Sequence, residues 1–398
     1  MSKYVLIPDS FKGTLSSAAI CRVMAEEICA LEPDAQVVSI PVADGGEGTV
    51  EAFLTAVGGE RIEVACKGPY FEDITGYFAM LPGGIAVVEM AVAAGLPMVG
   101  ERRNTEAATT YGVGQLIATA LDCGAKQVIL GLSGSATNDG GCGAAAALGV
   151  EFRNAAGETF IPVGGTLKDI VSVSLAHAHS LIKNVPFTTM CDIDNPLCGE
   201  TGASTVFGPQ KGADEAMVAR LDAGLRHLAD IVARDLKRDI LHLPGSGAAG
   251  GFGGGSVAFF NSALRMGIDI VLDITQFDRM AADADLVLTG EGKLDGQSLR
   301  GKVVIGVARR ARQLGAPSRR GSPWLPKRWL AAQDSWVSLW LLWWAPAKRM
   351  STRCMTRVSV VFSPSTPCLN HFEAVREHAE ENLRFTVSNL IRYTERLR

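Results

Sequence analysis

The 398-residue sequence lacks any run of about 18 apolar residues, the length that a membrane-spanning helix requires. Its start, Met1 to Pro8, also lacks the long apolar stretch and the cleavage site of a signal peptide. Its nine cysteines include no C-x-x-C pair, and Cys191 and Cys198 lie too far apart to indicate a zinc site. The formal net charge of −4 gives no electrostatic reason to expect nucleic acid or an anionic membrane. We therefore expect a cytoplasmic protein with reduced thiols.

Tryptophan is missing from most of the chain, because all six tryptophans lie between Trp324 and Trp344. The surrounding segment, residues 318–357, carries eight basic residues and one acidic residue, Asp334. The stretch from Trp336 to Trp344 has neither strand nor helix periodicity. One interpretation is an insert that contacts a membrane or a partner protein. We prefer the other: residues 318–357 are aberrant, a frameshifted stretch that replaces one strand and the loop after it.

The length allows two domains, since single cores rarely grow much beyond about 250–300 residues. Strand-like runs such as residues 4–8 and 37–42 alternate with helical patterns, which indicates βαβ units and a parallel sheet. After residue 58 the pattern changes to short alternating runs typical of antiparallel strands. The simplest architecture is an α/β domain formed by residues 1–66 and 284–398, with a second, α+β domain inserted at residues 67–283. We expect ligands to bind between the two domains.

Three loops combine glycine with small hydroxyls and carboxylates, and each follows a strand-like run. Glycine allows backbone N–H groups to approach an anion, and a following helix N-terminus favours negative charge. Carboxylates beside such a cradle would repel a bare phosphate unless Mg²⁺ lies between them. Together the loops predict phosphoryl transfer from a nucleotide, although for any one of them alone an ordinary βα turn is the favoured explanation. They are residues 43–49, 134–141 and 289–295.

Phosphoryl transfer needs a base near the acceptor hydroxyl, carboxylates that hold the metal, and cations on the transferred group. Asp192 follows a strand-like run and is the candidate base, while a structural Asx-turn explains it equally well. Lys12 and Lys293 are the other candidate catalytic residues. The candidate metal ligands, any two of which can instead cap helices, are Asp44, Glu47, Glu291 and Asp295. The candidate substrate- and phosphate-binding residues are Ser10, Asp44, Lys211, Gly134, Ser135, Thr137 and Gly140.

Two near-matches to nucleotide-binding motifs are weaker evidence of function than the three loops. Residues 296–303 almost form a P-loop, but Val303 stands where a Ser or Thr should hold Mg²⁺. Residues 245–250 fit G-x-G-x-x-G, yet the residues before them make a poor strand, so a dinucleotide fold is the weaker interpretation. The glycine-dense segment 245–255 predicts irregular structure, followed by a helix near residues 257–266.

Taken in order, the motifs resemble the bacterial glycerate kinases of the type I family. The matching stretches are Pro8–Lys12, Ala43–Thr49, Val88–Ala91, Gly134–Gly141, Cys191–Pro196, Phe207–Gly212, Gly247–Gly251 and Thr289–Asp295. The resemblance spans residues 1 to 317 and resumes by residue 380. It implies a flavodoxin-like parallel-sheet domain interrupted by a second domain. It also implies phosphorylation of D-glycerate by ATP and Mg²⁺, with 2-phosphoglycerate the favoured product, and it leaves a homo-oligomer open.

Two other functions remain as alternatives at this point. One is a non-catalytic regulator that binds a sugar acid in the same two-domain arrangement. It would need no metal-binding carboxylates, and the sequence contains no evident DNA-binding helix-turn-helix. The other is an NAD-dependent dehydrogenase, which would use the 245–250 motif for its cofactor.

Overall fold

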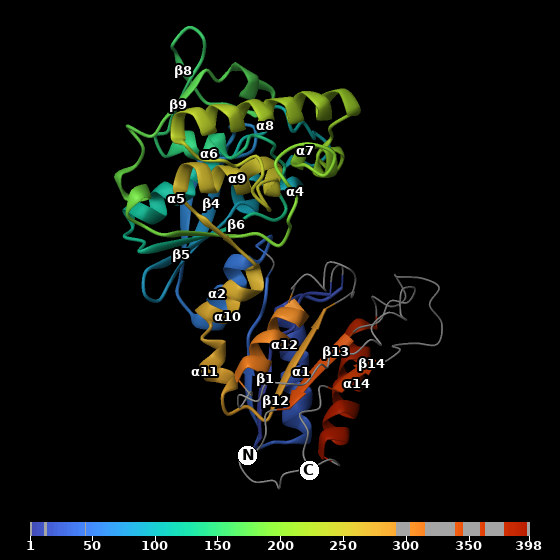
Figure 1. Ribbon diagram of the computed structural model, residues 1–398. Coiled ribbons are helices and arrows are strands. Elements are labelled where there is room, and N and C mark those ends of the chain that lie inside the picture. Colours follow the sequence, from blue (N-terminus) through green and yellow to red (C-terminus); the bar gives the residue numbers. More distant parts are fainter. Residues whose placement is uncertain are drawn as a thin grey trace, which may run out of the picture. The chain divides into compact units, whose positions relative to one another are not determined.

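The computed structural model (Figure 1) describes residues 2–11, 14–43, 45–291, 303–314, 339–344, 359–362 and 378–395. The chain divides into two compact units: unit 1 is Met1–Ala43 with Ile268–Arg398, and unit 2 is Asp44–Gly267. Compared with the domains expected from the sequence, residues 44–66 group with unit 2 and residues 268–283 with unit 1. Strand pairing explains the first difference, because β3 (Glu60–Lys67) pairs along its whole length with β4 (Asp73–Leu81).

Unit 1 contains a five-stranded sheet with the order β14-β13-β12-β1-β2. The central strand β1 pairs in parallel with both β2 and β12, whereas β13 pairs antiparallel with β12 and β14. The strands are β1 (Lys3–Leu6), β2 (Gln36–Ser39), β12 (Leu286–Glu291), β13 (Leu339–Trp344) and β14 (Ser359–Phe362). The tryptophan-rich stretch, for which the sequence predicted no regular structure, therefore contributes strand β13.

Two helices from opposite ends of the sequence, α1 (Ser17–Leu31) and α14 (Ala379–Glu395), pack against each other in unit 1 (Figure 1). Ser16 begins α1 as its N-cap, because its Oγ accepts a hydrogen bond from the N–H of Ala19 at 3.2 Å. Apolar side chains of both helices share one buried cluster with β1 and β12, and this cluster includes Ile20, Met24, Ile28, Leu383, Val387, Leu390 and Ile391.

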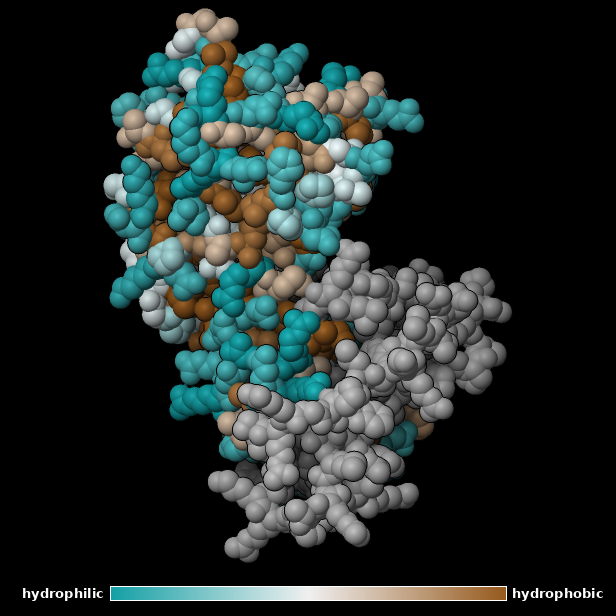
Figure 2. Space-filling view, in the orientation of Figure 1, coloured by the Kyte–Doolittle hydropathy of each residue, from teal (hydrophilic) through white to brown (hydrophobic). Residues whose placement is uncertain are grey.

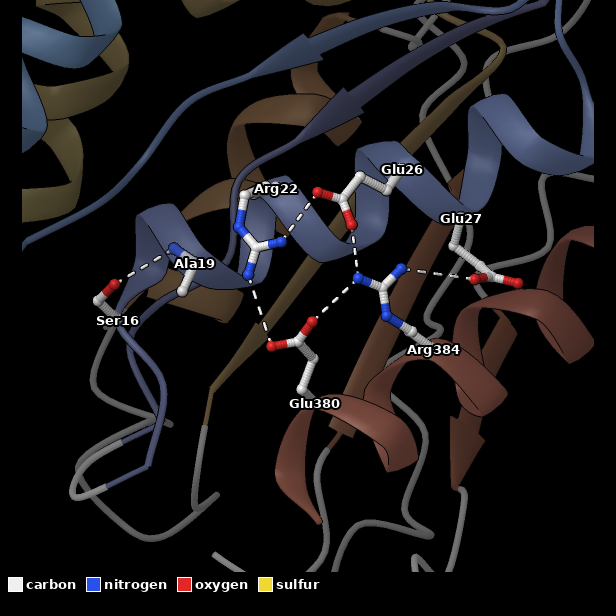
Figure 3. Close-up of polar contacts among 7 residues, drawn as sticks. All are labelled: Ser16, Ala19, Arg22, Glu26, Glu27, Glu380 and Arg384. Carbon is white, nitrogen blue, oxygen red and sulfur yellow. Dashed lines mark hydrogen bonds and ion pairs between the residues drawn. The ribbon is translucent and has the colours of Figure 1, made fainter. Parts of the chain in front are cut away.

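The solvent side of the same helix pair carries a network of ion pairs (Figure 3). Arg22 pairs with Glu26 at 2.8 Å and with Glu380 at 3.5 Å. Arg384 pairs with Glu380 at 2.9 Å and also reaches Glu26 and Glu27 of α1. Because these side chains are substantially exposed, the apolar cluster beneath them contributes more to stability than the ion pairs. Further helices of unit 1 are α10 (Gly267–Ile274), which begins at the last residue of unit 2, α11 (Phe277–Ala281) and α12 (Val303–Leu314).

Unit 2 is built on a six-stranded sheet with the order β11-β10-β6-β5-β4-β3. The strands not yet named are β5 (Ile85–Glu89), β6 (Gln127–Gly131), β10 (Phe187–Met190) and β11 (Ala263–Arg265). These four run parallel, and β4 and β3 continue the sheet antiparallel. The expected mixed α/β fold with parallel strands is thereby confirmed. Because the four strands are parallel, their carboxyl ends meet at one edge of the sheet.

Helices and a small second sheet complete unit 2. The helices are α2 (Thr49–Val57), α3 (Ala91–Ala94), α4 (Leu96–Val99), α5 (Tyr111–Asp122), α6 (Cys142–Ala147), α7 (Ala203–Phe207), α8 (Glu215–Leu236) and α9 (Ala248–Phe260), with 3₁₀ turns at Gly164–Asp169, Ser180–Lys183 and Pro209–Lys211. The small sheet contains β7 (Glu151–Arg153), β8 (Thr159–Phe160) and β9 (Ser172–Ser174).

Helix α8 shows the amphipathic pattern of a surface helix. Its inward residues Leu221, Leu225 and Leu228 are buried, whereas hydrophilic residues predominate along it on the face in Figure 2. Among the described ranges, none of the helices combines the length and the apolar character that crossing a membrane would need.

Helix α9 corrects the expectation that the glycine-dense segment 245–255 is irregular. The segment is helical from Ala248, with a kink at Ala249, Gly250 and Gly251, where φ is 52°, 65° and 91°. Its glycines permit close contact with the loop 134–141: a Cβ on Gly255 would lie 2.0 Å from the carbonyl oxygen of Gly140. Tertiary packing therefore overrides the low helix propensity of glycine here.

Candidate active site

The carboxyl edge of the unit 2 sheet collects polar residues from four strands. Glu89 ends β5, Ser133 follows β6, Asp192 follows β10, and Gly267 follows β11. The loop that begins at Gly45 lies against the same edge, since the N–H of Ser133 donates to the carbonyl of Gly45 at 3.1 Å. Ligands of parallel α/β sheets bind at such an edge, so these residues form the candidate site.

Glu89 is a buried carboxylate, 1% exposed, that caps helix α2 from outside the helix. Its two oxygens accept hydrogen bonds from the N–H groups of Gly48 and Val50, each at 3.2 Å. The pKa of Glu89 is raised to about 7. Burial is the main cause and the nearby charge of Glu47 adds to it, whereas the N–H donors act in the opposite direction. The glutamate therefore fixes the acidic loop 45–48 at the end of strand β5.

Asp192 is half-buried just beyond β10, and its Oδ1 accepts a hydrogen bond from the N–H of Gly267 at 2.7 Å. Gly267 is the first residue of helix α10, so the carboxylate lies at a helix N-terminus, where negative charge is favoured. One oxygen thus has a fixed position. This orientation suits either a helix cap or a base that accepts a proton from a bound hydroxyl.

The loop 134–141 is held by backbone hydrogen bonds on both sides. The carbonyl of Gly134 accepts from the N–H of Leu96 at 2.7 Å, and the N–H of Ala136 donates to the carbonyl of Ala94 at 2.9 Å. Further along the loop, the N–H of Gly140 donates to the carbonyl of Gly250 at 3.0 Å. The amide of Gly140, expected to cradle a phosphate, is thus used inside the fold, whereas Gly134 is exposed at the edge of the sheet.

Asp139 is a fully buried carboxylate that joins the N-termini of α5 and α6. Its Oδ2 accepts from the N–H and the hydroxyl of Thr110, both at 2.8 Å, and from the N–H of Gly143 at 3.2 Å, while its Oδ1 accepts from the N–H of Gly141 at 3.0 Å. Burial raises the pKa of Asp139, and these four donors oppose that rise. The first turn of α6 therefore already holds a carboxyl group of the protein itself.

Lys211 is buried, 3% exposed, and its Nζ points into the loop 134–141. It donates to Ser135 Oγ and to the carbonyl of Thr137, each at 2.7 Å. Desolvation lowers the pKa of Lys211 to about 7, while the charge of Asp139 acts in the opposite direction. Three residues expected to bind phosphate, Lys211, Ser135 and Thr137, thus lie together, with the ammonium bonded to the loop.

The remaining candidates are divided between the two units and the residues outside the description. Ser10 and Glu291 lie at the carboxyl edge of the unit 1 sheet, where the N–H of Asp9 donates to the carbonyl of Gly290 at 2.7 Å. Glu291 is buried there, whereas Glu47 of unit 2 is exposed. Lys12, Asp44, Lys293 and Asp295 lie outside the described residues. Within the described ranges, no group of three or more His, Cys, Asp and Glu side chains is placed to hold a metal ion.

Two ionisable residues at the site received no role from the sequence, Glu89 and Asp139. Both belong to motifs that carried the family resemblance. A usable signal existed for Glu89, because an acid directly after the apolar run 85–88 marks a carboxylate at a buried strand end. No such signal existed for Asp139. Its burial depends on contacts with residues 110 and 143, which the sequence of its own loop does not reveal.

Fold and site together are those of an α/β protein with acidic and glycine-rich loops at the carboxyl ends of its parallel strands. The model of the glycerate kinase family matches residues 4–319, and the chain belongs to this family. It is 45% identical over 317 residues to the glycerate kinase of Bacillus cereus, covering 79% of this chain and 83% of that relative. It is 41% identical over 317 residues to the glycerate 2-kinase of Escherichia coli, with coverage of 79% and 83%.

A solved structure to which this chain is similar is also assigned as a glycerate kinase. The crystal structure assigned as glycerate kinase 2 from Salmonella typhimurium LT2 superposes with a TM-score of 0.74 at 41% identity, covering 80% of this chain and 85% of that chain. The resemblance to glycerate kinases is confirmed, and the chain is a phosphotransferase with an alcohol acceptor rather than a regulator or a dehydrogenase. Membership of the family implies ATP as phosphate donor and a small-molecule substrate.

Proposed function

We propose that this chain is a type I glycerate kinase that transfers the γ-phosphoryl group of ATP to the C2 hydroxyl of D-glycerate, with Mg²⁺, forming 2-phosphoglycerate. The observation that carries the proposal is the family match over residues 4–319. The C2 position is supported by the 41% identity to a relative named glycerate 2-kinase.

Asp192 is the proposed general base. Its carboxylate is fixed by the Gly267 N–H at the edge where the parallel strands end. In the reaction it would accept the proton of the glycerate hydroxyl while that oxygen attacks the γ-phosphorus and ADP leaves.

The acidic loops are proposed to hold Mg²⁺ together with the nucleotide phosphates. Magnesium sites of this kind use one or two carboxylates and complete their shell with phosphate oxygens and water. The exposed carboxylate of Glu47, held by the anchored loop 45–48, fits such a role, and the other proposed ligands are Asp44, Glu291 and Asp295. When bound, the metal would neutralise charge on the transferred phosphoryl group.

The anionic groups of both substrates are assigned to the glycine-rich loops and the lysines. The exposed backbone of Gly134 is proposed to contact the nucleotide phosphates, with Ser135, Thr137 and Gly140 of the same loop behind it. Ser10, Lys12 and Lys293 are proposed for the carboxylate of glycerate and the transferred group. Of these three, Ser10 lies among the described residues, at the carboxyl edge of the unit 1 sheet.

We also propose that unit 1 is the flavodoxin-like domain and that unit 2 is inserted into it. Unit 1 combines two separate stretches of chain around the parallel strands β1, β2 and β12, and unit 2 is one continuous stretch. The proposed domain boundaries then lie near residues 43 and 268.

Residues 318–357 are proposed to result from a shifted reading frame. The family match ends at residue 319, where the unusual composition begins, and α14 beyond it buries apolar residues against α1. Resequencing the coding DNA around codons 317–358 tests this. A corrected frame should extend the family match past residue 319, and an unchanged DNA sequence would contradict the proposal.

The kinase proposal is tested by a coupled assay that measures ADP production by this chain. ADP should form when D-glycerate, ATP and Mg²⁺ are all present, and omission of any one should abolish it. Formation of ADP at the same rate without glycerate would exclude glycerate as the acceptor.

A further inference from the structure

The side chain of Lys211 connects two loops of unit 2 through its buried end. Lys211 closes the 3₁₀ turn Pro209–Lys211, and its Nζ donates to Ser135 Oγ and to the Thr137 carbonyl, each at 2.7 Å. The two acceptors lie two residues apart in the loop 134–141. A single ammonium therefore sets the backbone path between them.

The turn that carries Lys211 is itself fixed from the other side. Arg103 donates from its guanidinium to the carbonyl of Gln210 at 3.1 Å. The backbone of Arg103 also packs so closely on Gly212 that a Cβ there would lie 2.6 Å from its carbonyl oxygen. The lysine thus extends from a rigid turn rather than from a free loop.

Packing alone does not explain a lysine at this position. Burying an ammonium is costly, and the two hydrogen bonds of Lys211 go to a hydroxyl and a carbonyl rather than to a carboxylate, although Asp139 lies near enough to stabilise its charge. An apolar side chain of similar length would fill the same space at lower cost. The distinct property of the lysine is that it can donate two hydrogen bonds to the loop at once.

The loop has one part that the lysine holds and one part that faces the candidate site. Ser135 and Thr137 are buried, whereas Gly134 is exposed at the end of the loop next to β6. The Leu96 N–H holds the carbonyl of Gly134, and the rest of this exposed backbone depends on where the adjoining Ser135 is held.

We infer that Lys211 is a positioning residue for phosphoryl transfer, which presupposes the glycerate kinase activity proposed above: through Ser135 and Thr137 it fixes the backbone at Gly134 against the nucleotide. It does not contact the substrate in this role. The inference differs from the sequence-based assignment of Lys211 as a direct phosphate ligand.

The test compares Lys211→Met, which keeps the length of the side chain, with Lys183→Met, which removes an exposed lysine of the same unit. Amide hydrogen exchange is measured on the ligand-free proteins, segment by segment. In Lys211→Met the amides of residues 133–141 should exchange about tenfold faster or more, with the strands of unit 2 unchanged. The control should match the wild-type protein.

Steady-state kinetics provide the second readout. Loss of the positioning contact should lower kcat by about 10²-fold, since a small misplacement of reacting groups has an effect of that size. Adding Ser135→Ala to Lys211→Met should lower kcat no further, because both substitutions remove one shared contact. Additive losses would contradict the inference.

If hydrogen exchange of the amides of residues 133–141 is unchanged while kcat falls, the inference is overturned. Lys211 is then better explained as a direct phosphate ligand. If Lys211→Met does not fold, Ser135→Ala decides: faster exchange confined to the loop supports the inference, and unchanged exchange overturns it. If the wild-type chain phosphorylates no glycerate, the proposed function fails, and exchange still decides whether Lys211 holds the loop.

Discussion

Glu89 Oε2 accepts a hydrogen bond from the N–H of Val50 at 3.2 Å, so a buried carboxylate at the end of strand β5 caps helix α2. The N-cap residue of α2 is Gly48, which has no side chain to satisfy the first N–H groups. Glu89 supplies the missing acceptor from 39 residues further along the chain. The anchored loop carries Glu47, one of the proposed metal ligands.

This cap predicts a pH-dependent stability. The pKa of Glu89 is about 7 in the folded chain and 4.5 in its ordinary state, so between these values the folded chain keeps a proton that the unfolded chain has released. The contribution of Glu89 to the free energy of unfolding therefore falls as the pH rises from 4.5 to 7. The free energy of unfolding, measured with urea from pH 4.5 to 7.5, should decline less steeply with pH for Glu89→Gln than for the wild-type protein.

A matched control is Glu63→Gln, which changes an exposed glutamate of β3. Its pH dependence should follow that of the wild-type protein. If the free energy of unfolding changes with pH in the same way for Glu89→Gln and the wild-type protein, Glu89 does not titrate in this range.

Gly255→Ala should destabilise unit 2 and disturb the loop 134–141. The new Cβ would lie 2.0 Å from the carbonyl oxygen of Gly140, a contact that forces the helix and the loop apart. Overpacking of this kind costs about 1–3 kcal/mol. The measurement is the free energy of unfolding together with kcat.

Gly165→Ala is the control for this substitution, because the atom nearest to its new Cβ would be the carbonyl oxygen of Glu106 at 3.4 Å, an ordinary contact. It should unfold like the wild-type protein. Equal stabilities of the two alanine variants would contradict the close packing of α9 on the loop.

The helix pair α1 and α14 should depend on its apolar cluster rather than on its ion pairs (Figure 3). Leu390→Ala removes a buried side chain and should cost about 2–5 kcal/mol. Arg384→Ala removes the centre of an exposed network and should leave the unfolding midpoint almost unchanged. A larger shift for Arg384→Ala than for Leu390→Ala in thermal unfolding would contradict this order.

Asp192→Asn should lower kcat by about 10²–10⁴-fold if Asp192 is the general base. The amide oxygen can still accept the hydrogen bond from Gly267, so the fold should be retained. Asp194→Asn changes an exposed acid two residues away and serves as the comparison. Turnover by Asp192→Asn near that of the wild-type protein would assign Asp192 to helix capping alone.

Local patterns predicted the parallel strands β1 and β2 near the start of the chain and the placement of Asp192 after a buried strand. Those features depend on apolar runs and on the residues that directly follow them. The sequence predicted a helix only near residues 257–266, and the glycine-dense first part of α9 was wrongly expected to be irregular, because contacts of Gly250 and Gly255 with the loop 134–141 determine its structure. The inward direction of Lys211 was missed for the same reason, since its partners lie 74 and 76 residues away in sequence.

Strand β13 shows a different limit. The stretch that forms it has no alternation of apolar and polar residues, so periodicity gave no sign of a strand. Its antiparallel pairing with β12 and β14 is a property of the assembled sheet. Sequence spacing alone does not contain that information.

Phosphorus NMR of the product formed from D-glycerate, ATP and Mg²⁺ by this chain tests the central claim most directly. A new resonance with the chemical shift of 2-phosphoglycerate, growing together with ADP, is the predicted result. A spectrum in which ATP persists, or in which only inorganic phosphate appears, would contradict glycerate phosphorylation by this protein.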